Sequence, residues 1–120
     1  MANTTFASDT DQLEISALLD RVGGDEELLR EITGIFLEEY LVLISEIREA
    51  VETGDCVQLE RSAHSLKGSV SNFGAADATR AACDLEVMGR SKQMSDTRRA
   101  LRVLEDEFAS LAPALKAIVG

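Results

Sequence analysis

Apolar residues recur at three- and four-residue steps along most of the 120-residue chain, which is the period of amphipathic α-helices. No segment shows sustained alternation of β-branched residues, and no Asn-Gly or Asp-Gly turn separates two apolar runs. The pattern therefore predicts an all-α fold. Residues 1–11 are rich in Thr, Ser and Asp, and we expect them to form a flexible tail ahead of one helical domain over residues 12–120.

Glycines and capping residues divide this pattern into five predicted helices. Gly23-Gly24, Gly54 and Gly74 mark helix ends, and Asp25 is placed to cap the start of the second helix. Asp55 is followed three residues later by Gln58, which resembles a capping box for the third helix. The predicted helices cover about 12–22, 25–53, 55–72 and 75–90, with a last one starting near Ser95.

The apolar positions assign a core face to each long helix. The second helix would face the core with Leu28, Ile32, Ile35, Phe36, Leu43, Ile47 and Val51. The fourth would use Ala78, Ala82, Leu85 and Met88, and the last Leu101, Leu104, Phe108, Leu111, Leu115 and Ile118. Pro113 is expected to bend the last helix. Four amphipathic helices and a short N-terminal one predict an antiparallel four-helix bundle with an additional short N-terminal helix.

Three further apolar residues widen the face of the second helix: Leu37, Leu41 and Val42. Packing under the short N-terminal helix is the default interpretation, and a partner surface is the alternative.

Composition narrows the function classes. The net charge of −10 and pI near 4.5 argue against binding nucleic acid or anionic membrane surfaces. The longest apolar run, Tyr40 to Ile44, is far too short to cross a membrane, and no apolar leader is present, so we expect a cytoplasmic monomer. Neither Cys56 nor Cys83 lies in a CxxC motif; Cys83 is expected to be a buried small hydrophobe, and Cys56 is left open.

The third helix carries the only histidine of the chain. Its apolar residues form one stripe, spaced 4, 3, 4 and 3 residues apart: Leu59, Ala63, Leu66, Val70 and Phe73. His64 lies roughly 140° from the centre of that stripe and is therefore predicted to face solvent. Lys67 and Gly68, three and four residues later, share its face.

Gly68 is unusual because glycine costs about 1 kcal/mol relative to Ala inside a helix. Together, Gly68 and Lys67 indicate that His64 is an accessible nucleophile, with a cation beside it and no bulky side chain next to the imidazole. The hydroxyls of Ser69 and Ser71 are nearby. The competing interpretation is an ordinary solvated histidine. A metal site is disfavoured because His64 has no partner histidine and Lys67 would repel a cation. Neither a GxSxG elbow nor a GxxxxGK[ST] loop is present.

The segment from His64 to Ser69 (HSLKGS), followed by Asn72 to Ala75 (NFGA), resembles the signature of histidine-containing phosphotransfer (HPt) domains of two-component phosphorelays. Residues 19–29, 36–40 and 85–90 are similar to the family's other helices, so the resemblance covers about residues 12–119. Two departures are visible. Leu41 stands where many relatives have Pro, and Glu86 stands where some have a Gln near the phosphohistidine.

The resemblance implies roles for individual residues. His64 would accept a phosphoryl group from an aspartyl phosphate on a response-regulator receiver domain, Lys67 would balance its charge, and Gly68 would let the partner approach. The receiver would bring Mg²⁺ and the aspartate, so the chain needs no cofactor and is a phosphocarrier, not an enzyme. A sensor or hybrid histidine kinase would be a further partner. Arg90 either favours its helix C-terminus or lies near the site, as basic residues do in some relatives.

Two alternatives stay open. The chain could be the phosphoacceptor module of a chemotaxis-type kinase, although Leu66 and Ala75 fit the ordinary phosphorelay type better. It could also be a helical adaptor without chemistry, in which His64 is incidental.

Overall fold

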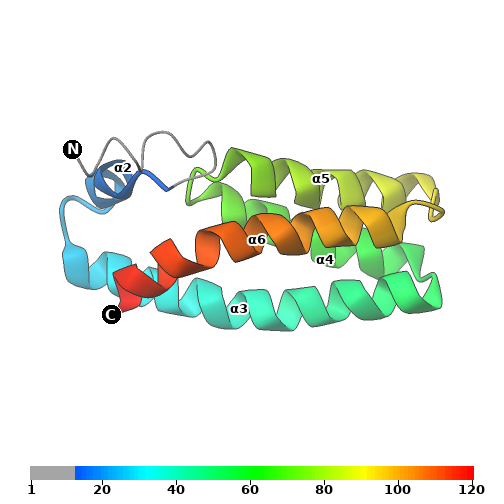
Figure 1. Ribbon diagram of the computed structural model, residues 1–120, viewed down its shortest axis with the longest axis horizontal. Coiled ribbons are helices and arrows are strands. Elements are labelled where there is room, and N and C mark those ends of the chain that lie inside the picture. Colours follow the sequence, from blue (N-terminus) through cyan, green and yellow to red (C-terminus); the bar gives the residue numbers. More distant parts are fainter. Residues whose placement is uncertain (1–12) are drawn as a thin grey trace.

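The computed structural model describes residues 13–120, and every regular element within that range is a helix. The helices are α2 (Ile15–Arg21), α3 (Glu26–Thr53), α4 (Cys56–Ser71), α5 (Ala76–Ser91) and α6 (Thr97–Val119). The long helices α3 to α6 run up and down side by side, and α2 lies at the end of the bundle where α3 begins (Figure 1). The prediction of an antiparallel four-helix bundle with a short N-terminal helix is confirmed. Gln12 and the expected tail lie outside the described residues.

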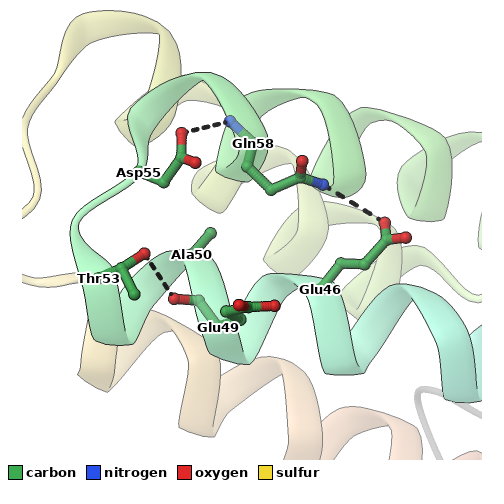
Figure 2. Close-up of a pocket in the computed structure, with 6 residues that line it drawn as sticks. All are labelled: Glu46, Glu49, Ala50, Thr53, Asp55 and Gln58. Carbon is green, nitrogen blue, oxygen red and sulfur yellow. Dashed lines mark hydrogen bonds between the residues drawn. The ribbon is translucent and has the colours of Figure 1, made fainter.

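Where the structure describes them, the helices begin and end within about two residues of the predicted positions. The two predicted N-caps, Asp25 and Asp55, both form. Asp25 accepts a hydrogen bond from the backbone N–H of Leu28, and Asp55 accepts one from that of Gln58, each at 3.0 Å. The capping box itself does not close. The Gln58 side chain turns away to donate to Ser62 and Glu46, as Figure 2 shows for Glu46. Asp55 therefore caps α4 alone.

The core face of α3 differs from the prediction in its first half. Leu29, Thr33 and Tyr40 are buried there, whereas Leu28 and Ile32 are each 38% exposed and Ile35 is 61% exposed. The helix has 28 residues and α4 and α5 have 16 each, so the first turns of α3 extend past their ends (Figure 1). With fewer neighbours there, fewer of its apolar residues can be covered.

The default interpretation of Leu41 and Val42 is also wrong. Both are exposed, so they do not pack under α2, while Leu37 is partly buried against the core. The remaining predicted core positions lie as expected, apart from partial exposure at Met88, Leu101, Phe108 and Ile118. Helix α6 continues through Pro113 without interruption.

Gly89 sets the distance between α4 and α5. A Cβ at this position would lie 2.7 Å from the backbone N of Glu60 and 2.8 Å from the backbone O of Cys56, closer than real atoms approach. Only glycine permits this crossing, which brings the C-terminal part of α5 against the first turns of α4, the helix that carries His64.

Gly89→Ala is therefore expected to destabilise the fold by about 2 kcal/mol, because α4 and α5 must separate to admit the methyl group. Urea unfolding measures the effect. Gly34→Ala is the matched control: Gly34 is also inside a helix, but a Cβ there meets nothing within 4 Å, so the helix propensity of Ala should stabilise it. Equal stability of the Gly89 variant and the wild type would contradict this close approach.

Candidate functional site

His64 lies in the middle of α4, on the side opposite its buried stripe. Leu59, Ala63 and Leu66 are each 0% exposed, whereas the His64 side chain is 66% exposed. The sequence-based placement of the histidine on the solvent side agrees with this geometry. The imidazole is free to meet a partner because the burial of α4 needs only the other face of the helix.

One ring nitrogen of His64 is hydrogen-bonded to Glu86 of α5. Nδ1 lies 2.8 Å from the Glu86 Oε2 atom. An ionised carboxylate can only accept, so Nδ1 carries the hydrogen and donates it. In the neutral ring the lone pair then lies on Nε2. Glu86 thus selects the tautomer in which the nitrogen farther from the helix is the nucleophile.

Glu86 is ionised because the groups around it favour its charge. Its side chain is only 4% exposed, and the Nζ of Lys67 lies 2.7 Å from its Oε1 atom. This contact with Lys67, followed by the hydrogen bond from His64, holds the pKa of the carboxyl below its usual value of 4.5, although burial alone would raise it. The carboxylate is therefore a fixed negative charge beneath the imidazole at neutral pH.

Arg90 completes this arrangement. Its Nη2 lies 2.7 Å from Glu86 Oε2, and its Nε donates to Glu60 of α4 at 3.0 Å. Helices α4 and α5 are thereby joined by two carboxylates and two cations beside His64. The structure brings together His64, Lys67 and Arg90 through Glu86, the residue that the sequence left without a role.

The signal for Glu86 was present but incomplete. Glu86 stands at a position where some members of the family that the sequence resembles carry Gln, and Arg90 follows it at i+4, a spacing that favours an ion pair. Its contact with His64, 22 residues earlier, depends on the close packing of α4 on α5, which no local pattern encodes.

Gly68 is exposed, and a Cβ on it would meet no atom of the described residues within 4 Å. No packing requirement explains a glycine here, in contrast to Gly89. The predicted hydroxyls lie elsewhere: Ser69 donates to Glu39 of α3 at 2.8 Å, and Ser71 donates to the backbone oxygen of Gly68 at 2.9 Å. Neither serine therefore contacts the imidazole.

An open hollow between α4 and α5 adjoins the imidazole. It is lined by Val57, Glu60, Arg61, His64, Ser65, Glu86 and Arg90. Within residues 13–120 no group of three or more His, Cys, Asp and Glu side chains is placed to hold a metal ion.

Cys56 and Cys83 are free thiols of intermediate burial. Cys83 is less buried than predicted because it lies at the margin of the α5 core face.

Comparisons with known proteins agree with this fold and motif. The profile of the Hpt domain family matches residues 31–114, and the chain belongs to that family. A search of curated protein sequences finds no match. Among solved structures, the chain is similar to histidine-containing phosphotransfer protein B (HptB) from Pseudomonas aeruginosa PAO1. The two share 24% identity and a TM-score of 0.80 over 88% of this chain and 91% of the other, a likeness of fold.

Membership of the Hpt family carries a coarse function with it: a histidine phosphotransfer role in two-component phosphorelays. Across the part of the chain that the structure describes, no helix is both long enough and apolar enough to span a bilayer.

The buried carboxylate of Glu86 makes stability depend on pH. We expect Glu86→Gln to cost about 1–2 kcal/mol at neutral pH, because the neutral amide no longer forms the ion pairs with Lys67 and Arg90. The folded pKa of Glu86 lies below the unfolded value of 4.5, so its contribution is present above that pH and disappears as the pH falls through the folded pKa.

Thermal unfolding of both proteins between neutral and acidic pH tests this expectation. The gap in melting temperature between wild type and Glu86→Gln should narrow as the pH falls below about 4.5. A gap that stays constant across this range would show that the carboxylate charge contributes nothing to the fold.

Proposed function

We propose that this protein is a phosphorelay intermediate whose His64 accepts a phosphoryl group from the aspartyl phosphate of a receiver domain and passes it to a response regulator. One observation carries the proposal: an imidazole that is 66% exposed donates its Nδ1 hydrogen to a buried, ionised Glu86, which leaves the Nε2 lone pair facing solvent. A surface histidine without a function would not be expected to hydrogen-bond a carboxylate that, like Glu86, is only 4% exposed.

The transfer needs little from this chain beyond placement of the nucleophile. The Nε2 lone pair forms the N–P bond while the bond between phosphorus and the aspartyl oxygen breaks, and that electron pair returns to the receiver's carboxylate. Nδ1 keeps its hydrogen bond to Glu86, whose negative charge stabilises the imidazolium that forms. The receiver supplies Mg²⁺ and the in-line geometry, so the chain acts as a carrier without cofactor or catalytic apparatus of its own.

Lys67 and Gly68 support this reaction in different ways. Lys67 is paired with Glu86 and only 31% exposed, so its charge lies near the site before phosphate arrives and can help balance the phosphoryl group. Gly68 leaves open space beside His64 for the partner's active site. The partners are receiver domains and a sensor or hybrid histidine kinase, and we place this exchange in the cytoplasm.

The experiment is to mix the protein with a receiver domain carrying labelled aspartyl phosphate and Mg²⁺. Label should appear on this chain as an acid-labile, base-stable adduct, which is the behaviour of a phosphoramidate. A complex that forms without transfer of label would favour the helical adaptor, and the proposed carrier function would be rejected.

A further inference from the structure

The hollow beside His64 is lined by two arginines with different surroundings. The charge of Arg90 is already paired, because its guanidinium contacts both Glu86 and Glu60. Arg61 is exposed and, among residues 13–120, makes no ion pair or hydrogen bond through its side chain. Lys67 is also ion-paired, with its Nζ 2.7 Å from Glu86 Oε1. Arg61 is thus the cation beside this histidine whose charge the described part of the chain leaves uncompensated.

We propose that the guanidinium of Arg61 binds the oxygens of the phosphoryl group on His64 Nε2, and so acts as the primary charge partner of the phosphorylated state. This inference rests on the proposed function and names a residue that positions and neutralises the transferred group. It shifts the main electrostatic role from Lys67, where the family resemblance places it, to a residue that lies about one turn before His64 on α4.

Geometry supports the assignment. Arg61 precedes His64 by three residues, so the two side chains are neighbours on one face of α4. Both line the same hollow. Because Nδ1 is turned toward Glu86 of α5, a phosphoryl group on Nε2 would lie on the ring's other nitrogen, away from that carboxylate and on the helix face that also carries Arg61.

Chemistry supports it as well. A guanidinium presents a planar set of N–H donors that fits two phosphoryl oxygens at once, which an ammonium cannot do. Lys67 can reach the phosphoryl group only by weakening its contact with a carboxylate that is 4% exposed, and that exchange leaves a buried charge short of a partner. Within the described part of the chain, Arg61 has no such contact to give up.

The first test does not depend on a receiver. His64 is phosphorylated chemically with phosphoramidate, and the ionisation of its phosphoryl group is followed by ³¹P NMR against pH. In Arg61→Ala we expect the phosphoryl group to ionise at higher pH than in wild type, because the nearby cation that favours the dianion is gone. Arg61→Lys should restore part of the shift. Arg99→Ala is the matched control. It removes an exposed arginine of α6 that lies outside the hollow and has no ion pair with any residue from 13 to 120.

The second test measures transfer from a phosphorylated receiver under saturating and subsaturating conditions. Arg61→Ala should slow transfer at saturation about tenfold or more, with a smaller change in KM, while Arg99→Ala behaves like wild type. A phosphoryl ionisation in Arg61→Ala identical to that of wild type would overturn the inference, as would an effect confined to KM, which marks a docking residue. If the wild type accepts no label from the receiver, the proposed function fails. If Arg61→Ala still changes the ionisation of the chemically added phosphoryl group in that case, the contact between Arg61 and the phosphoryl group is nevertheless supported.

Discussion

Replacing His64 by Gln is expected to abolish phosphoryl uptake completely while leaving the bundle folded. The side chain is 66% exposed and its helix buries the opposite face, so its removal should change the free energy of unfolding by no more than about 0.5 kcal/mol. A Gln amide has no nucleophilic lone pair comparable to that of Nε2, yet it can still donate a hydrogen bond to Glu86. Loss of function without loss of fold is the signature of a phosphoacceptor.

Uptake is measured with a labelled receiver, and folding with circular dichroism and thermal unfolding. Ser65→Ala is a suitable control, because this exposed neighbour lines the same hollow and has no proposed role. Retention of an acid-labile label by His64→Gln would show that another residue accepts phosphate. A large drop in melting temperature would instead show that the imidazole is part of the fold, through its contact with Glu86.

The helices could be predicted from sequence because the signals for them are local. Asp25 and Asp55 are followed by apolar periods of three and four residues, and both cap the helices that they were expected to cap. The stripe of α4 is equally local, and the placement of His64 follows from it. Each of these features depends on residues within one or two turns of each other, which is the range over which pattern and propensity act.

The errors came from tertiary context. The apolar period of α3 continues through Leu28, Ile32 and Ile35. Periodicity alone cannot tell that the helices packed on these turns cover the neighbouring face, which carries Leu29 and Thr33. The partner of Glu86 likewise depends on how closely α5 approaches α4. That approach is set by Gly89, which the sequence does not distinguish from any other interior glycine. Only the structure shows that an added Cβ would lie 2.7 Å from the neighbouring backbone.

The site is built on this crossing. Gly89 draws α5 against α4, which places the carboxylate of Glu86 beneath His64 and within reach of Lys67 and Arg90. This negative charge can orient the imidazole, while its ion pairs with Lys67 and Arg90 offset its repulsion of the incoming phosphate. The chemistry of the exposed ring nitrogen thus depends on a backbone contact between Gly89 and the first turns of α4.

Gly68→Gln should produce the opposite pattern to Gly89→Ala, with stability retained and function lost. A side chain at position 68 points into open space, and Gln has a higher helix propensity than Gly by several tenths of a kcal/mol. The melting temperature should therefore equal or exceed that of the wild type. The same side chain would stand one turn from His64, where the receiver must bring its aspartyl phosphate to Nε2, so we expect transfer to slow at least a hundredfold.

Receiver binding, transfer rate and melting temperature are compared in Gly68→Gln and in Gly34→Gln. The control adds the same side chain at an interior helical glycine of α3 that is also free of neighbours and lies outside the hollow. It should gain the same helix propensity and keep normal transfer. If Gly68→Gln melts lower and transfers normally, the glycine serves the packing of α4, and cleared space beside the histidine has no part in the reaction. If both variants transfer slowly, the effect arises from added bulk on the bundle in general and not from access to His64.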